Sequence, residues 1–319
     1  IPFLPQIPIR NQKEFMIFQA LEGLPGLKPE ENGSASLNLD TWSAGAHTLN
    51  KKLEKAFASG DGIESAFEEF EPSVESFSCW KPFTWELNER KIKKAKIQLA
   101  GPLTCQWILK TTEPQVSTQI FRLILARLMG MTRRLRRKGV TPVVFLDEPG
   151  LCALSPTQPQ HLLSLQELKV VIRTLQKEGA EVGIHCCSQT HWPSVLGLGH
   201  NWLSIDSGLS LSSLLDHKEA LQIFFKNGGK LSLGVIPTSS YTDPSRKIDF
   251  EALSAEEIFY QTLQAFENKK TFTTQEIKNI LAHSLYTPAC GLALLKTQDA
   301  DNILNTLIEF KQIAERNLF

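Results

Sequence analysis

Short apolar runs alternate with longer stretches of helical periodicity along most of this chain. The apolar runs are rich in Val, Ile and Leu and end in glycine or polar residues, as buried strands do. Strands are therefore predicted at residues 95–99, 142–146, 181–187, 202–205, 231–235 and 285–290. Helices are predicted at residues 14–24, 49–58, 63–70, 117–138, 160–177, 211–226, 254–267, 274–283 and 302–316.

This alternation predicts βαβ units and a parallel sheet, hence an α/β fold. Residues 1–8 contain three prolines and are expected to be extended, which brings the strand-like segments to seven. A (β/α)8 TIM barrel needs eight strands, so the first strand is expected to lie before Ile1. Residues 26–88 have a weaker pattern and are interpreted as a helical insertion that covers one end of a single barrel domain, residues 1–319. A doubly wound sheet is the alternative, although no G-x-G-x-x-G phosphate loop occurs.

The amino-acid composition of the chain narrows the classes of molecule that it is expected to bind. The chain has 319 residues, is 42% hydrophobic, and carries 34 basic and 34 acidic residues, so its formal net charge is zero. Neither a nucleic-acid nor a membrane partner is expected from this balance, and the basic run at 133–138 is interpreted as a solvated helix end. The six cysteines are scattered rather than grouped as a disulfide framework, and no secretory signal is visible, which predicts a cytoplasmic protein with reduced thiols.

The predicted strand at 181–187 ends in side chains that bind soft metals. His185 and Cys187 are two residues apart, so on a strand they point to the same face while Cys186 points away. An imidazole and a thiolate on one face form half of a tetrahedral zinc site. The alternative is a core histidine beside two buried apolar cysteines.

Polar side chains also follow the other strands. Residues of this kind at the carboxyl ends of strands are Thr104, Asp147, Glu148, His185, Cys187, Asp206 and Cys290. In a barrel this rim carries the active site, which favours a site over a random scatter. Asp206 offers an oxygen ligand or a helix N-cap, and Cys290 offers a thiolate or a small apolar side chain. Two sulfurs, one nitrogen and one oxygen would suit zinc.

These segments resemble a known family. Gly-Ile-His-Cys-Cys at 183–187, Ser-Ile-Asp-Ser at 204–207 and Pro-Ala-Cys-Gly-Leu at 288–292 are similar to the catalytic barrel of cobalamin-independent methionine synthase. Asp-Glu-Pro-Gly-Leu at 147–151 and Gly-Pro-Leu-Thr at 101–104 resemble two further segments of that family, in the same order. The resemblance covers residues 94–295. It implies a zinc ion held by His185, Cys187, Asp206 and Cys290, with Asp147 in the substrate pocket.

The chain also departs from that family. The acidic ligand is usually Glu, whereas Asp206 is one methylene shorter. These 319 residues do not include the family's second barrel, the glycine-serine strand that opens the catalytic barrel is expected to lie before Ile1, and residues 234–239 lack the acidic and His residues that the family carries there. The chain is therefore more similar to short single-barrel relatives grouped with uroporphyrinogen decarboxylase and methionine synthase. Some of these relatives take methyl groups from a corrinoid protein.

The resulting hypothesis is a methyltransferase in which zinc activates a thiol such as homocysteine. Asp147 would anchor the substrate ammonium, Glu148 and Thr104 would lie in the substrate pocket, and the methyl donor would be a corrinoid or a folate-type molecule. Trp107 and Tyr286 are candidates for the donor pocket, or for core and rim positions. A metal-free decarboxylase is one alternative, but it needs an arginine-rich pocket near the first strand, where only Arg10 occurs. A non-catalytic protein that keeps structural zinc or binds a corrinoid partner is the other.

Overall fold

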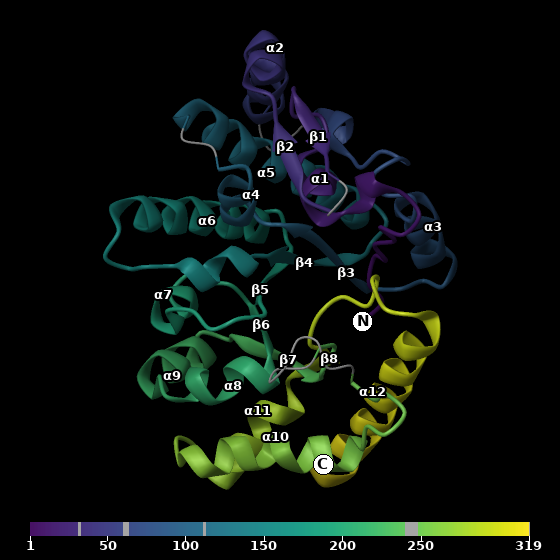
Figure 1. Ribbon diagram of the computed structural model, residues 1–319, viewed down its shortest axis with the longest axis vertical. Coiled ribbons are helices and arrows are strands. Elements are labelled where there is room, and N and C mark those ends of the chain that lie inside the picture. The colour runs from purple at the N-terminus through teal and green to yellow at the C-terminus, as the bar shows by residue number, and fades with distance from the viewer. Residues whose placement is uncertain (31–32, 60–63, 111–112, 240–247, 319) are drawn as a thin grey trace. The chain divides into compact units, whose positions relative to one another are not determined.

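The computed structural model describes residues 1–30, 33–59, 64–110, 113–239 and 248–318 (Figure 1). The backbone groups into two compact units. The first unit holds residues 1–150 and 157–183, and the second holds residues 151–156 and 184–319. Each unit is described by itself below.

The fold is α/β and is built on a six-stranded sheet whose order follows the sequence. Its strands are β3 (Lys94–Ala100), β4 (Thr141–Asp147), β5 (Glu181–Cys186), β6 (Trp202–Asp206), β7 (Lys230–Ile236) and β8 (Leu285–Pro288). β3 pairs with β4 in parallel, and β7 pairs in parallel with both β6 and β8. The six predicted strands are therefore confirmed, with ends that differ by one or two residues.

In the first unit, helices and a small hairpin surround the start of the sheet. These elements are η1 (Gln12–Glu14), α1 (Met16–Leu21), β1 (Leu27–Pro29), β2 (Ala35–Leu37), α2 (Leu39–Ala58), η3 (Glu64–Phe70), α3 (Trp80–Glu89), α4 (Pro102–Ile108), α5 (Pro114–Arg137) and α6 (Pro159–Lys177). Ala95, Ile97 and Leu99 are every second residue of β3, so their side chains share one face, and all three are fully buried. The other face of β3 carries Lys94, Lys96, Gln98 and Ala100.

The N-terminal segment runs beside β3. Phe3 forms a parallel bridge with Lys96, and the Leu4 N–H donates to the Lys96 carbonyl oxygen at 2.9 Å. The Lys96 N–H donates in turn to the Pro2 carbonyl oxygen at 2.8 Å. Proline cannot continue a helix but tolerates an extended chain, which explains why this segment is extended as expected.

The segment 26–88 differs in detail from the prediction. α2 begins at Leu39, ten residues before the expected start, because Asn38 caps it by accepting a hydrogen bond from the Thr41 N–H at 2.8 Å. The β1–β2 hairpin and α3 were not predicted. The Trp42 indole N–H donates to Gln119 of α5 at 2.7 Å, which holds α2 against that helix. Ile63, at the start of the predicted helix 63–70, lies outside the described residues.

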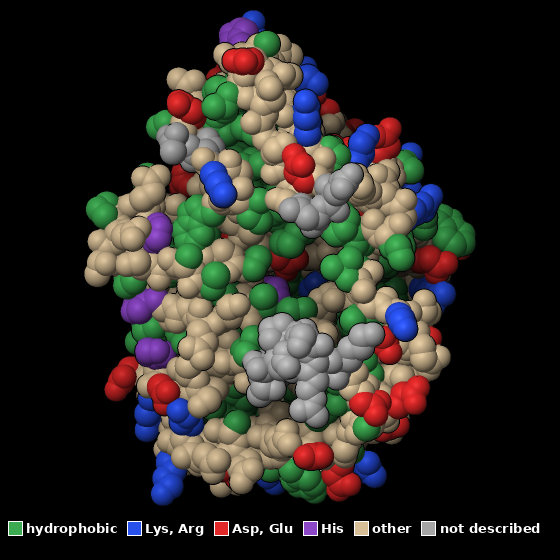
Figure 2. Space-filling model, in the orientation of Figure 1, with side chains coloured by type: hydrophobic (Ala, Val, Ile, Leu, Met, Phe, Trp, Pro, Cys, Tyr) green, Lys and Arg blue, Asp and Glu red, His purple; other side chains and the backbone are tan. Residues whose placement is uncertain are grey.

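The basic run at the end of α5 is paired with carboxylates of the first unit. Arg133 makes a two-pronged contact with Glu178, at 3.0 Å and 2.8 Å, and Arg137 lies 2.5 Å from Glu68. On the face shown in Figure 2, acidic and basic side chains are interspersed. Among the described residues, no helix has both the length and the apolar character needed to cross a membrane.

In the second unit, helices follow each strand. They are α7 (Trp192–Leu196), α8 (Ser207–Leu215), α9 (Lys218–Lys226), α10 (Ala255–Lys269), α11 (Thr274–Ala282) and α12 (Thr297–Leu318). The short helix η4 (Pro149–Ala153) follows β4 and belongs to this unit from Leu151 on. The prediction of one helix at 211–226 was wrong, because the chain breaks at Asp216 and His217 and starts again as α9. The two helices bury separate faces, through Leu211 and Leu214 in α8 and Leu221 and Phe224 in α9.

Two helices of the second unit, α10 and α11, begin with a side chain that accepts a hydrogen bond from the first turn. At the start of α10 a capping box forms only in part: Ser254 accepts from the Glu257 N–H at 3.2 Å, whereas the Glu257 carboxylate accepts from Gln261. A complete capping box forms instead at the start of α11, between Thr273 and Glu276.

Candidate metal centre

Three predicted ligands meet in the second unit. His185, Cys187 and Cys290 each offer one ligand atom, and these three atoms all lie within 4.8 Å of one another. His185 lies in β5 and Cys187 follows its last residue, so both side chains use the same face, as their spacing predicts. Cys186 points to the other face, where it is fully buried and its thiol contacts the Ser188 carbonyl oxygen at 3.2 Å.

β8 delivers the third ligand. Cys290 lies two residues beyond the end of β8, and the Ala289 N–H donates to the Ile236 carbonyl oxygen at 2.8 Å. The approach of this segment depends on Gly234 in β7. A Cβ atom at Gly234 would lie 2.7 Å from the Ala289 Cα and 2.8 Å from the Ile205 carbonyl oxygen, so only glycine fits there without a shift.

His185 is oriented by a residue that sequence reasoning did not select. Its Nδ1 lies 3.0 Å from the hydroxyl oxygen of Ser204, which is buried in β6. Metal-bound histidines usually hydrogen-bond a partner through the second ring nitrogen, which fixes the ring and its tautomer. The signal for Ser204 was its position two residues before Asp206, on the same strand face.

The two thiols interact with each other. The pKa of Cys187 is lowered to about 4, because Cys290 and His185 hydrogen-bond its thiolate. The same hydrogen bond raises the pKa of Cys290, and burial and the negative charges of Cys187 and Asp206 add to this. The Thr238 hydroxyl also hydrogen-bonds Cys290 and is a second residue that the sequence did not single out. One thiolate is therefore favoured before any cation binds.

Asp206 does not belong to the three-residue cluster. Its carboxylate is buried, and Oδ1 accepts a hydrogen bond from the Leu209 N–H at 3.2 Å, so it is the N-cap of α8. This is the alternative that the sequence left open for Asp206. The carboxylate still lies close enough to Cys290 to affect the pKa of that thiol.

The other predicted site residues, Thr104, Asp147 and Glu148, lie in the first unit. Glu148 is fully buried and accepts hydrogen bonds from the Leu103 N–H at 3.2 Å and the Thr104 N–H at 2.7 Å. Burial raises the pKa of Glu148 to about 7, although these bonds and the Thr104 hydroxyl oppose the shift. The Thr104 hydroxyl oxygen also accepts from the Gly150 N–H at 3.0 Å. Glu148 and Thr104 thus hold the chain after β3 and β4, and Asp147 ends β4.

The two aromatic candidates for a donor pocket have other contacts. The Trp107 ring lies against His161, with ring centroids 4.9 Å apart. The Tyr286 ring packs on Phe310 at 4.9 Å, and its hydroxyl donates to the Leu281 carbonyl oxygen at 2.7 Å. Tyr286 is therefore part of the packing between β8 and the helices around it.

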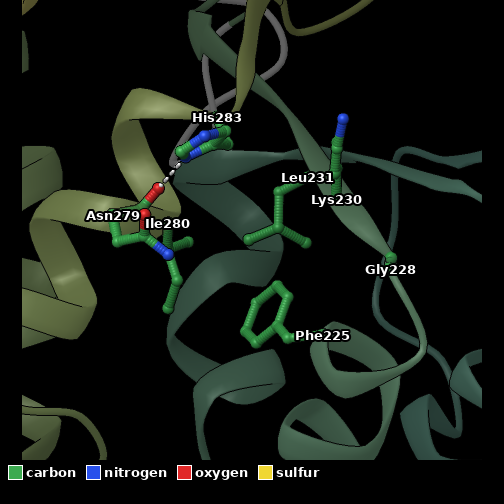
Figure 3. A pocket seen from close by; sticks show the side chains of 8 residues that line it. Phe225, Gly228, Lys230, Leu231, Asn279, Ile280 and His283 are labelled. Atoms are coloured by element: carbon green, nitrogen blue, oxygen red, sulfur yellow. Dashed lines mark hydrogen bonds between the residues drawn. The ribbon is translucent and has the colours of Figure 1, made fainter.

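A cavity of about 270 Å³ in the second unit lies away from the strand ends that carry the cluster. It is formed around the start of β7 and the end of α11, by residues that include Phe225, Lys230, Asn279 and His283 (Figure 3). His283 is turned toward its own helix, since its Nδ1 lies 2.8 Å from the Asn279 carbonyl oxygen. None of the predicted site residues lines this cavity.

The three clustered residues fit zinc in chemistry and spacing. Zinc binds Cys sulfur at about 2.3 Å and His nitrogen at about 2.0–2.1 Å, so ligand atoms of one tetrahedral ion lie roughly 3.5 Å apart. Nitrogen and sulfur donors within 4.8 Å of one another can reach such an ion with small side-chain movements. Neither the comparison with protein-family models nor the comparison with curated proteins finds a match for this chain.

Proposed function

We propose that this protein is a zinc-dependent methyltransferase that moves a methyl group to a substrate thiol such as homocysteine. The observation that carries the proposal is the meeting of His185, Cys187 and Cys290 within 4.8 Å. The Ser204 hydroxyl at His185 Nδ1 supports it, because that contact leaves Nε2 to bind the cation. The order of the five sequence segments similar to methionine synthase supports the choice of reaction.

A ligand set of two thiolates and one imidazole would leave one tetrahedral position for the substrate. Catalytic zinc sites typically keep three protein ligands and one open position. Asp206 was predicted as a fourth ligand, but it could bind only by weakening the cap of α8. We therefore propose that Asp206 stays outside the ligand shell, or yields to the incoming thiol.

Bound zinc would supply one piece of chemistry, namely a lower pKa of the substrate thiol, which is only a few per cent thiolate when free at neutral pH. The residues of the chain would do the rest. Cys187 and Cys290 would balance the cation charge, and Ser204 would hold the His185 ring in place. In the transfer, a sulfur–carbon bond forms to the methyl group, its bond to the donor breaks, and that electron pair leaves with the donor. The donor would be a methylcorrinoid, carried by a corrinoid protein, or a folate-type molecule.

In the first unit, Asp147 would bind the ammonium group of an amino-acid thiol, as an anion at the end of β4 can. Glu148 and Thr104 are already bonded to the chain and to each other, so they would shape the loop around the substrate. We also propose that the fold is a single (β/α)8 barrel with residues 26–88 as an insertion. The six-stranded sheet in sequence order and the parallel bridge between Phe3 and Lys96 support this.

The test is a zinc analysis joined to a transfer assay. The purified protein, reconstituted with zinc, should hold about one zinc per chain. Cys187→Ser and Cys290→Ser should lose that zinc, whereas Cys152→Ser, at an exposed cysteine outside the cluster, should keep it. With homocysteine and methylcobalamin the wild-type protein should form methionine. A protein that binds no zinc contradicts the metal site.

The same experiment separates the enzyme from a non-catalytic zinc protein. Cys290 is exposed and His185 and Cys187 are half-buried, and access of this kind favours a site open to substrate over a closed structural one. Full zinc occupancy without turnover, for any thiol and for both corrinoid and folate donors, would support the structural alternative.

A further inference from the structure

Lys96 places a cation on the sheet face that also carries Asp147. It lies in β3, on the same face as Gln98 and Ala100, and the register sets Gln98 beside Phe145 and Ala100 beside Asp147. The Lys96 ammonium donates to the Gln98 side-chain oxygen at 2.9 Å and lies 5.0 Å from the centroid of the Phe145 ring. All of these residues belong to the first unit.

The groups around this ammonium are held in place. The Gln98 amide N–H donates to the Leu4 carbonyl oxygen at 2.7 Å, so its oxygen is directed at Lys96. The Phe145 ring fills the space over Gly183, where a Cβ atom would lie 2.5 Å from the ring. Lys96 therefore contacts a buried amide and a buried ring rather than exposed surface groups.

The charge of Lys96 is only partly compensated. An amide oxygen and an aromatic ring are neutral partners, and among the described residues no carboxylate oxygen lies within 4.0 Å of Nζ. Burial lowers the pKa of Lys96, and the more distant Asp147 raises it in part. A half-buried cation that no carboxylate of the described residues pairs with is costly, and a bound carboxylate would remove that cost.

We propose that Lys96 binds the carboxylate, and Asp147 the ammonium, of an α-amino acid substrate. Asp147 acts on the charge of Lys96 without forming a salt bridge to it, and a zwitterion carries one group for each of these two opposite charges. This rests on the proposed function and narrows it, because it selects amino-acid thiols over thiols that carry only an anionic group. Lys96 is a binding residue in this account.

The test measures binding of ligands without sulfur to protein stripped of metal. Calorimetry would compare L-norleucine with pentylamine, which lacks the carboxylate, and with hexanoate, which lacks the ammonium. We expect norleucine to bind best, and Lys96→Met to weaken it at least about tenfold while leaving pentylamine unchanged. Asp147→Asn should weaken norleucine and pentylamine but leave hexanoate unchanged. Lys94→Met is the matched control, since Lys94 shares the face but is paired with Glu181 at 2.6 Å.

This binding test decides for or against the role of Lys96 and needs neither bound zinc nor methyl transfer. If norleucine does not bind, or if Lys96→Met leaves its affinity unchanged or weakens pentylamine equally, the assignment is overturned. If Lys96→Met does not fold, the wild-type comparison of norleucine with pentylamine decides, and Lys96→Arg should keep norleucine binding within a few-fold. If the protein binds norleucine but fails the zinc test, this inference stands and only the proposed metal chemistry is overturned.

Discussion

The Nδ1 atom of His185 and the hydroxyl oxygen of Ser204 lie 3.0 Å apart on neighbouring strands β5 and β6. This contact connects a predicted ligand to a buried serine, a residue type that is not among the usual ligands of zinc. It occupies Nδ1 of the imidazole ring and leaves Nε2 to bind a cation together with Cys187 and Cys290.

Ser204→Ala should therefore weaken zinc binding by about 10- to 100-fold, the range usual for partners that orient a metal-bound histidine. The reason is lost orientation of His185, because no ligand atom is removed. Competition with a chromogenic chelator measures the affinity. Ser232→Ala is the control, since Ser232 is a buried serine paired with Ser204 in the register of β6 and β7. Equal zinc affinity in both variants would show that the His185 contact has no role in metal binding.

Gly234→Ala should move Cys290 away from the other two ligands. The new methyl group would lie 2.7 Å from the Ala289 Cα, and backbone atoms can relieve this overlap only by shifting the segment before Cys290. We expect weaker zinc binding and a loss of stability of about 1–3 kcal/mol. Chelator competition and urea unfolding measure the two effects.

Gly291→Ala is the control for this shift, because a Cβ atom at Gly291 meets nothing within 4 Å although the residue adjoins Cys290. If Gly234→Ala retains wild-type zinc affinity, the close approach of β7 to Ala289 does not position Cys290.

The pairing of His185 with Cys187 followed from their spacing, whereas Cys290 was predicted only through the family resemblance and Ser204 was not predicted. His185 and Cys187 converge because side chains on a strand alternate, and this needs only their spacing of two. The contact of His185 with Ser204 depends on how β5 and β6 are aligned, which the residues of either strand do not encode alone. Cys290 is 103 positions from Cys187, and β6 and β7 separate β8 from β5 in the sheet, so the two thiols meet only because the sheet curves and the chain after β8 passes close to Gly234.

Asp206 shows how one residue type can serve two purposes. At a strand end followed by a helix, Asp suits a metal ligand and an N-cap equally well. The structure uses it to cap α8, since the Leu209 N–H is within reach on the same chain segment. Similarly, the break between α8 and α9 was missed because apolar residues recur on both sides of Asp216 and His217.

Gly101→Ala should destabilise the first unit through Glu148. A Cβ atom at Gly101 would lie 2.0 Å from the Glu148 Oε1, so the carboxylate would have to leave the N–H groups of Leu103 and Thr104. Unpaired buried N–H groups cost about 1–3 kcal/mol. Urea unfolding of Gly101→Ala, Glu148→Ala and the double variant measures this. The double variant should lose less than the sum of the single losses, and strict additivity would show that the two residues act independently.

His200→Phe should remove an acid sensitivity of the second unit. His200 is buried against Phe224, neither of its ring nitrogens has a hydrogen-bond partner among the described residues, and burial lowers its pKa to about 3. Its pKa in the unfolded chain is near 6.5, so below that pH the unfolded state binds a proton that the folded state does not. The folded state should then lose stability as the pH falls from 6.5 toward 3.

The loss of stability caused by His200 alone is the difference between the free energies of unfolding of the wild-type protein and of His200→Phe. Between pH 7 and pH 5 the free energy of unfolding of the wild-type protein should fall by about 2 kcal/mol relative to His200→Phe. Groups common to both proteins, such as Glu148, cancel in the comparison. Urea unfolding across this range supplies the data, and Phe keeps a ring of similar size against Phe224. A difference that does not change with pH would mean that His200 is protonated in the folded protein as easily as in the unfolded chain.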